Sequence, residues 1–282
     1  MEDKDKEKYI LKIPNSEDEA SEWIENQKKV DKLLVDKLLK ETFVDYTGEV
    51  NIPQYLEIGD KYVIEKYLGE DLEPELYDEL SDEEKDKITR DMAEFLVYLH
   101  NKHRDGDNNR KLILDETDEW KSLQEIFEHV KSRLTETEQK DLLEKINKFK
   151  NRDKSDEVVV LTHGDIRSQN MLYDKDTKKV AFIDFELMED GNVYNDFIPA
   201  ASFGLTYELL FNIIDYYNKE SEFKIDKEKV ELIHELSMWH EFGRVSILDN
   251  NKEFPKDAYD EIKERINSLE EAYQNNIDKA KN

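Results

Sequence analysis

The sequence predicts an α+β fold, in which a small lobe built from a sheet and a helix precedes a larger, mainly helical lobe. Short apolar alternations of strand length occur at 8–13 and between 53 and 67, and helical periodicity dominates after Gly69. A second group of apolar, strand-length runs interrupts the helical part between Val158 and Glu186. These three patterns indicate a first lobe with a sheet and a helical second lobe that contains a short sheet of its own.

The boundary between the lobes is expected near residues 64–69. Gly59-Asp60 separates two strand-like runs and is a turn signal that predicts an antiparallel hairpin. The composition becomes helical directly after this hairpin. We therefore predict a first lobe over 1–69 and a second lobe over 70–282.

Capping patterns mark the start of several expected helices. Ser81 with Glu84, and Thr135 with Glu138, have the spacing of a capping box, in which each side chain satisfies a backbone N–H of the other residue. The other expected helices are one capped by Asn15 or Ser16 that reaches Leu38, and stretches of helical periodicity at about 195–218, 226–248 and 256–277.

The composition indicates a folded protein with no membrane span. Of the 282 residues, 37% are hydrophobic and 10% aromatic, which is enough for a packed core although 40% are charged. No run approaches the 18 or more apolar residues of a transmembrane helix, and the first ten residues lack a signal-peptide core. Because there is no Cys, a disulfide framework and a thiolate metal site are excluded, and we expect a cytoplasmic protein.

The formal net charge of −28 restricts the partners. It comes from 70 Asp and Glu residues against 42 Lys and Arg residues. Neutralising the phosphates of a nucleic acid requires clustered cations, so this charge argues against a nucleic-acid partner. The carboxylate surplus favours a cationic partner, or serves only to keep the surface solvated. The oligomeric state is not indicated.

The main candidates for catalytic and metal-binding residues lie in a polar loop between two of the strand-like runs of the second lobe. The loop carries His163, Asp165, Arg167 and Asn170, and the next run ends at Asp184. Loops at strand ends are where a rigid scaffold displays catalytic groups. Phosphoryl transfer needs a carboxylate to orient the acceptor hydroxyl and oxygen ligands for Mg²⁺, and this loop supplies both. The alternative is that these polar residues only satisfy backbone groups of the loop.

The same residues resemble the catalytic segment of the aminoglycoside phosphotransferase-like branch of the protein-kinase-like fold, whose bilobal architecture the resemblance implies. It implies that Asp165 acts on the acceptor hydroxyl, that Asn170 and Asp184 bind Mg²⁺, and that Asp196 supports the loop. Arg167, two residues after Asp165, stands where related kinases often carry a lysine on the transferred phosphate. His163 is expected to hold the loop in shape more than to transfer protons.

The resemblance also extends to the first lobe. Lys12 resembles the nucleotide-phosphate lysine, and Glu25 resembles its ion-pair partner, with Glu22 as the alternative if the helix register differs. The segment from Tyr62 to Gly69 resembles the hinge between the lobes. This implies that the backbone of Glu65 and Tyr67 contacts the nucleotide base.

The C-terminal helical region resembles the part that lines the acceptor pocket in aminoglycoside kinases. Trp239 and Glu241 are its candidate acceptor-binding residues. Trp239 can equally be a core residue, since large aromatic side chains are mostly buried.

One departure from the family concerns the phosphate-covering loop. Only eleven residues precede Lys12, and the first glycine is Gly48. The two strands and the covering loop with which family members normally begin are therefore not expected. Either the chain is naturally short, or its true start is missing, or a nucleotide is held without this cover. In the last case the nucleotide would be positioned less well and protected less from water.

The leading hypothesis is a phosphotransferase that uses ATP (or GTP) and Mg²⁺ to phosphorylate a hydroxyl of a small molecule. The acidic composition favours a cationic acceptor such as an aminoglycoside, which implies a role in antibiotic resistance. A kinase of an amino alcohol, homoserine or a sugar is the alternative within this fold. A non-catalytic, pseudokinase-like binding module is the alternative from another class.

Overall fold

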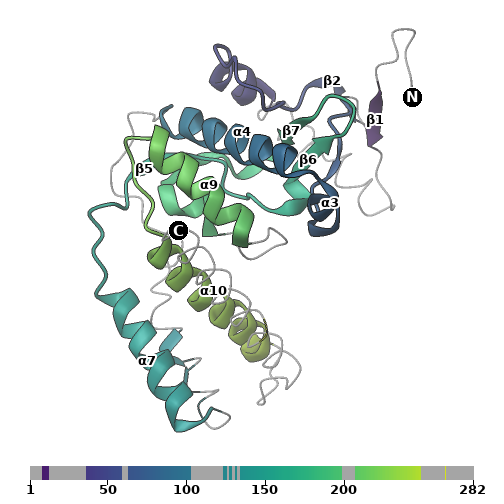
Figure 1. Ribbon diagram of the computed structural model, residues 1–282. Coiled ribbons are helices and arrows are strands. Elements are labelled where there is room, and N and C mark those ends of the chain that lie inside the picture. The colour runs from purple at the N-terminus through teal and green to yellow at the C-terminus, as the bar shows by residue number, and fades with distance from the viewer. Residues whose placement is uncertain are drawn as a thin grey trace.

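The computed structural model describes residues 8–12, 36–58, 63–102, 123–125, 127–128, 131, 134–198, 207–248 and 264. Its described part has a three-stranded sheet at one end, helices packed against two further small sheets in the middle, and a pair of helices at the other end (Figure 1). This arrangement is the mixed α+β fold that the sequence predicts.

The first sheet has the strand order β1-β3-β2 and is antiparallel throughout. Its strands are β1 (Tyr9–Lys12), β2 (Tyr55–Ile58) and β3 (Val63–Lys66). The antiparallel pairing of β2 with β3 confirms the predicted hairpin, whose turn lies outside the described residues. The helix expected after Asn15 also lies outside them up to residue 35, and residues 36–42 are helical.

Both predicted capping boxes are present. Ser81 Oγ accepts the Glu84 N–H at the start of α4 (Asp82–His100), and Thr135 Oγ1 accepts the Glu138 N–H at the start of α7 (Glu136–Lys150). In each case the Glu side chain returns to the backbone N–H of the cap, at 3.1 Å and 2.7 Å respectively. A short helix, α3 (Pro74–Glu79), precedes α4.

Two small antiparallel sheets follow in the second lobe. One has the order β4-β6-β7 and consists of β4 (Glu70–Asp71), β6 (Met171–Asp174) and β7 (Lys179–Phe182). The other pairs β5 (Val159–Thr162) with β8 (Glu189–Asn192). Short 3-10 turns lie between the strands, namely η2 (Ser168–Asn170), η3 (Phe185–Leu187) and η4 (Val193–Asp196).

The remaining helices are α9 (Tyr207–Glu220) and α10 (Lys227–Leu248). The prediction of a helix from about 195 is wrong at its start, because Val193–Asp196 forms the 3-10 turn η4. The Asn192 side chain accepts the Tyr194 N–H and so begins the turn, at 3.0 Å. The helix predicted at 226–248 is confirmed, and the one at 256–277 lies outside the described residues except for Glu264.

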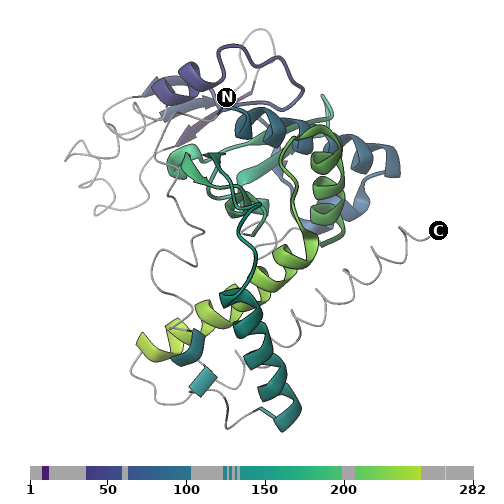
Figure 2. The ribbon, with the colours of Figure 1, turned by 90° about the vertical axis from the view of Figure 1, so that its left-hand side faces the viewer.

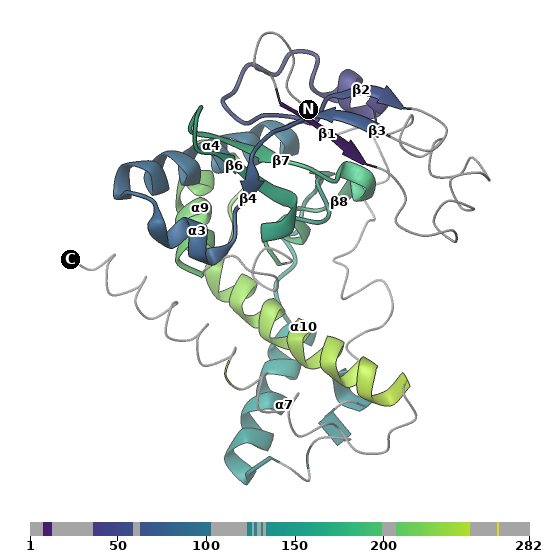
Figure 3. The ribbon, with the colours of Figure 1, turned by 90° about the vertical axis from the view of Figure 1, so that its right-hand side faces the viewer.

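The main core lies where α4 and α9 pack together beneath the β6–β7 hairpin. Phe95 of α4 stacks on Phe182 of β7, with 4.7 Å between the ring centres, and both rings are fully buried. The β1-β3-β2 sheet lies on the opposite side of the hairpin from these helices (Figure 3). The hairpin therefore separates the first sheet from the helical core. None of the described helices is both long enough and apolar enough to cross a lipid bilayer.

The helices α7 and α10 cross each other and project away from this core (Figure 2). Lys145 of α7 lies 2.8 Å from the buried carboxylate of Glu235 of α10, which ties the two helices together. We call α7 and α10 the arm. It leaves the core on the side of the short sheet formed by β5 and β8.

Candidate active site

The loop predicted to be catalytic connects β5 to η2, and His163 is its first residue. The imidazole ring is completely buried, with Phe185 at 4.4 Å between the ring centres. Its Nε2–H donates to the Ile183 carbonyl at 3.0 Å, and its Nδ1 accepts the Asp165 N–H at 3.3 Å. Burial lowers the pKa of the ring, and only a neutral ring can fill both roles. His163 thus joins the loop to the end of the β6–β7 hairpin.

The Asp196 carboxylate holds the beginning of this loop from η4. Its Oδ2 accepts the His163 N–H at 2.9 Å, and its Oδ1 accepts the Gly164 N–H at 2.8 Å. The Nε2 of His100 lies 3.0 Å from the same Oδ2, and the Nδ1 of His100 lies 2.8 Å from the Tyr217 hydroxyl. Burial acts to raise the pKa of Asp196. The hydrogen bond and charge of His100 outweigh this effect, together with the contacts to His163 and Gly164, and hold the pKa below its usual range.

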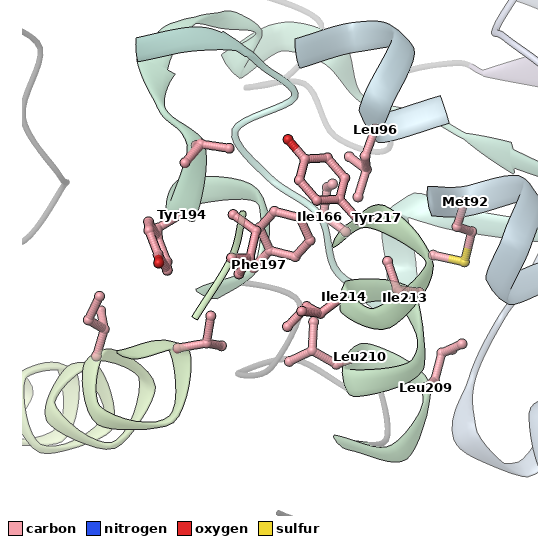
Figure 4. Close-up of a cluster of buried hydrophobic side chains, with 14 of the residues drawn as sticks. Met92, Leu96, Ile166, Tyr194, Phe197, Leu209, Leu210, Ile213, Ile214 and Tyr217 are labelled. Atoms are coloured by element: carbon pink, nitrogen blue, oxygen red, sulfur yellow. The ribbon is translucent and has the colours of Figure 1, made fainter. Parts of the chain in front are cut away.

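An apolar residue fixes the centre of the loop. Ile166 is only 2% exposed, although its neighbours in the chain are polar and partly exposed. Its side chain enters the cluster formed by α4, α9 and η4, near Leu96 and Tyr217 (Figure 4). The buried Ile166 therefore anchors the loop, while the next residue on each side, Asp165 and Arg167, stays partly exposed.

The Asp165 carboxylate is held in one orientation by two groups of the same loop. Its Oδ2 accepts a hydrogen bond from Asn170 Nδ2 at 2.7 Å and lies 3.1 Å from an Nη of Arg167. Within the described part of the chain, its Oδ1 has no partner, and the side chain is 21% exposed. One carboxylate oxygen is thus fixed and the other is open to a ligand.

Arg167 has a donor that is still available. Its Nε is buried and has no hydrogen-bond partner among the residues that the structure describes. A buried donor without a partner costs about 1–3 kcal/mol, so such a group marks a position where an anion would stabilise the site.

The hairpin brings Asn170 and Asp184 to the same end of the sheet. Met171 of β6 pairs with Phe182 of β7, and the Ile183 N–H donates to the Asn170 carbonyl at 2.9 Å. Asp184 follows directly, in the left-handed conformation with φ 64° and ψ 60°. Asp tolerates this conformation better than most residues, and it marks a position where strain is retained at a site.

The oxygen atoms of Asn170 and Asp184 fit a magnesium ion. Both hydrogen bonds of the Asn170 side chain use its Nδ2, so its Oδ1 is the atom that remains for a ligand. The partly buried Asp184 carboxylate has no partner among the described residues. Mg²⁺ is bound through one or two carboxylates together with phosphate oxygens, and this donor set matches that requirement.

Gly164 is required by the shape of the loop. Its φ is +83°, and a Cβ at this position would lie 2.5 Å from the Leu187 carbonyl oxygen. A side chain would therefore clash with the turn that follows Asp184. The close approach keeps the Asp165 loop and the Asp184 turn in contact.

The structure describes the candidate nucleotide-binding residues only in part. Lys12 ends β1 and pairs with Val63 of β3, but its side chain lies outside the description, as does Glu25. Glu65 lies in the central strand of the first sheet, and the Tyr67 N–H donates to the Lys8 carbonyl at 3.0 Å. The Tyr67 N–H is therefore engaged within the protein, and contact of the Glu65 and Tyr67 backbone with a nucleotide base stays a prediction.

A small apolar cluster lies on the side of the hairpin that faces the first sheet. It consists of Leu68, Leu172 and Ala181, with Ile183 packed against them. Residues alternate between the two faces of a strand, so Leu172 faces this cluster whereas Met171 and Tyr173 face the main core. The cluster borders Asn170 and Asp184, and it supplies an apolar surface beside the candidate phosphate site.

The candidate acceptor residues lie in α10. Trp239 is 5% exposed and belongs to the main hydrophobic core, which is the alternative that the sequence left open for it. The side chain of Glu241 lies outside the described residues. The role of Trp239 and Glu241 in binding an acceptor stays a prediction.

Sequence reasoning missed two residues that support the loop, one through Asp196 and one by direct contact. His100 is fully buried in the last turn of α4, and a lone histidine at a helix end gives no sign of the carboxylate it will meet. Glu73 precedes α3, and its carboxylate accepts hydrogen bonds from Ser168 Oγ at 3.3 Å and Gln169 Nε2 at 3.4 Å. Both are long-range contacts that local spacing cannot show.

This geometry, with one oriented carboxylate beside an amide and a second carboxylate at the end of a hairpin, defines a protein-kinase-like phosphotransferase fold. The sequence matches the phosphotransferase enzyme family over residues 2–232, so the chain belongs to that family. No curated protein is significantly similar to this sequence.

Solved structures share the fold at low sequence identity. The GDP complex of a variant of aminoglycoside 2'-phosphotransferase-IIIa is 20% identical, with 95% of this chain and 86% of that chain covered and a TM-score of 0.60. ADP-bound aminoglycoside phosphotransferase APH(2'')-Ib is also 20% identical, with 94% and 88% covered and a TM-score of 0.53. Macrolide 2'-phosphotransferase MphH from Brachybacterium faecium is 10% identical, with 94% and 85% covered and a TM-score of 0.55.

Proposed function

We propose that this protein transfers the terminal phosphoryl group of a nucleoside triphosphate to a hydroxyl of a small molecule. The observation that carries the proposal is the Asp165 carboxylate, whose Oδ2 is fixed by Asn170 and Arg167 while its Oδ1 is open. Family membership supports the same reaction class. We further propose that residues 1–69 form the nucleotide-binding lobe and 70–282 the catalytic and acceptor-binding lobe.

Asp165 is the residue that meets the acceptor. Its open Oδ1 accepts the hydroxyl proton and directs the oxygen at the phosphorus atom, as transfer through a loose transition state requires. The hydrogen bond from Asn170 at 2.7 Å prevents the carboxylate from rotating. The reaction forms a new O–P bond on the acceptor, breaks the bond to the leaving nucleoside diphosphate, and releases the hydroxyl proton through Asp165.

Arg167 and Lys12 neutralise the phosphate oxygens in this proposal. The unpartnered Nε of Arg167 is a donor beside Asp165, where the transferred group would pass. Lys12 stands at the end of β1, and Glu25 is its proposed partner. Charge on the transferred group is spread over its oxygens in the transition state, so fixed cations at these positions lower the barrier.

Asn170 Oδ1 and the Asp184 carboxylate are the proposed magnesium ligands. When bound there, Mg²⁺ supplies positive charge to the phosphate oxygens and holds them in position. The apolar cluster of Leu68, Leu172 and Ala181, with Ile183, is the proposed surface for the base of ATP or GTP, and the hinge backbone at Glu65 and Tyr67 is proposed to make its polar contacts.

The proposed acceptor is a cationic small molecule, such as an aminoglycoside-type antibiotic. The net charge of −28 supports a cation, because an acidic surface attracts it and raises its rate of encounter. An aminoglycoside acceptor would make the protein an antibiotic-resistance enzyme, and a cytoplasmic location is part of this proposal.

The test is a coupled nucleotide assay with ATP and GTP, each with and without Mg²⁺, against aminoglycosides, macrolides, choline, homoserine and sugars. The proposal predicts Mg²⁺-dependent turnover that Asp165→Asn lowers by about 10³-fold or more while nucleotide binding is retained. The matched control is Asp176→Asn, because Asp176 is 82% exposed in the turn of the β6–β7 hairpin. Turnover that survives Asp165→Asn would refute the assigned role.

The second candidate is a non-catalytic module that binds a nucleotide. The observation in its favour is that the Tyr67 N–H, in the segment proposed to contact a base, already donates to the Lys8 carbonyl. It predicts a thermal shift with a nucleotide and no transfer to any acceptor.

A further inference from the structure

Both helices of the arm leave the core at one point, and a group of buried charges lies there. Lys229, in the first turns of α10, is only 8% exposed. Its Nζ contacts the Asp156 carboxylate, lies 3.1 Å from the Glu157 carboxylate, and donates to the Asp153 carbonyl. These three acceptors belong to the segment that joins α7 to β5, so Lys229 ties the start of α10 to the end of α7.

A second cation completes the group. Arg152 meets Glu157 with two hydrogen bonds, at 2.7 Å from Nε and 3.2 Å from Nη2, and the two side chains are each 4% exposed. The guanidinium also lies over the Phe149 ring of α7, at 4.0 Å. The group therefore contains two cations and two carboxylates in a largely buried place, where removal of one charge leaves another without compensation.

The same group reaches the turn that supports the catalytic loop. The Tyr194 hydroxyl donates to Asp156 at 2.6 Å and accepts the Asp226 N–H, just before α10, at 3.0 Å. Lys229 lies over the Tyr194 ring at 5.0 Å. Tyr194 and Asp196 are both in η4, and Asp196 holds the loop of Asp165.

We propose that Lys229 and Tyr194 are positioning residues that fix the direction of the arm relative to the Asp165 loop, and so set the affinity for the acceptor. This inference rests on the proposed function, in which the arm belongs to the acceptor-binding lobe. Neither residue touches the reacting atoms. They act through η4, whose Asp196 side chain holds the Asp165 loop and whose Tyr194 side chain contacts the start of the arm.

The first test separates the acceptor from the nucleotide. In Lys229→Met, which keeps the length of the side chain without its charge, we expect kcat/KM for the acceptor to fall about 10- to 100-fold, as for a misplaced substrate. The KM for the nucleotide should stay within about two-fold, because the arm does not form the nucleotide site. Lys229→Arg should restore most of the acceptor kcat/KM, since it returns the positive charge.

A second variant guards against a failure to fold. Tyr194→Phe keeps the ring under Lys229 and removes only the hydroxyl that joins Asp156 to Asp226. It should show the same selective loss for the acceptor, to a smaller extent. The matched control is Lys148→Met, which removes an exposed lysine that lies 3.8 Å from Glu228, also between α7 and α10. We expect this control to behave as the wild type.

A distance measurement tests the inference without any turnover. The chain has no Cys, so Glu94→Cys on α4 and Glu144→Cys on α7 allow two spin labels to be attached at exposed positions. Lys229→Met should broaden the distance distribution between the labels, and Lys229→Arg should keep it narrow.

The outcomes are separable. An unchanged distance distribution together with an unchanged kcat/KM for the acceptor would overturn the positioning role. Equal losses for acceptor and nucleotide, accompanied by a lower melting temperature, would also overturn it, because they indicate general destabilisation. If the wild type phosphorylates no acceptor, the proposed function fails, and the spin-label distances still decide whether Lys229 fixes the arm.

Discussion

Replacing Asp196 should both destabilise the protein and disorder the loop that carries Asp165. The carboxylate accepts hydrogen bonds from the backbone of His163 and Gly164 and from His100, at 2.9, 2.8 and 3.0 Å. In Asp196→Asn, the amide oxygen can replace Oδ2, which accepts two of these bonds. The amide nitrogen then faces the Gly164 N–H, and one buried donor loses its acceptor.

The structure gives the size of the effect. One buried donor left without a partner, and one charge-assisted hydrogen bond made neutral, should lower the free energy of unfolding by about 2–3 kcal/mol. Asp196→Ala removes all three acceptor contacts and should cost roughly 3–5 kcal/mol. The pKa of Asp196 is lowered in the folded protein, so its contribution is fully present above about pH 4 and is lost as the pH falls further.

Urea unfolding at pH 7, followed by circular dichroism, measures these differences. Asp176→Asn serves as the control because Asp176 is exposed in a turn, and its change should stay within about 0.5 kcal/mol. Amide hydrogen exchange should also show faster exchange at His163 and Gly164 in Asp196→Asn. If both Asp196 variants unfold at the wild-type urea concentration, the three hydrogen bonds do not hold the loop.

Three further predictions concern the loop and its surroundings. Gly164→Ala should lower the free energy of unfolding by roughly 1–3 kcal/mol in urea titrations, because the new Cβ meets the Leu187 carbonyl at a positive φ; a neutral result would contradict that geometry. Thr135→Ala should cost about 1 kcal/mol through loss of the α7 cap, and equal melting temperatures would show that the cap is not formed. Burial lowers the pKa of His163 in the folded protein, so as the pH falls the unfolded chain takes up a proton at this residue before the folded protein does. The stability that His163 contributes should therefore be lost as the pH falls below about 6.5. The urea midpoint of the wild type should therefore fall more between pH 7.5 and pH 5.5 than the midpoint of His163→Gln. Equal falls in the two proteins would refute the contribution of His163.

Local sequence patterns predicted the structure correctly where the contacts that determine it join residues close in sequence. The capping boxes at Ser81 and Thr135 need only residues three positions apart, and both are formed. The pairing of β2 with β3 follows from one turn signal between two alternating runs. The spacing of Asp165 and Asn170 placed both in one loop, and their hydrogen bond joins residues five apart.

Long-range partners could not be predicted in the same way. His100 meets Asp196 across 96 positions, and Lys229 meets Asp156 across 73, in a chain where 40% of residues are charged. So many opposite charges give each lysine dozens of candidate partners, and nothing local selects among them. The start of the helix predicted at 195 failed for a related reason. The sequence pattern is helical, but two side chains hold the turn η4 instead. Asn192 accepts the Tyr194 N–H, and Asp196 accepts the N–H of His163 in the distant loop.

The two-sided β6–β7 hairpin has a consequence for how this protein can change. Met171 and Tyr173 belong to the helical core, whereas Leu172 and Ala181 belong to the cluster that faces the first sheet. Substitutions at alternate positions of one strand therefore act on different properties. Mutations at the positions facing the first sheet should alter the surface proposed to hold a nucleotide base, while the packing that keeps the protein folded is conserved. A library randomised at these positions alone should yield folded variants with new ligand preferences far more often than one randomised at their immediate neighbours.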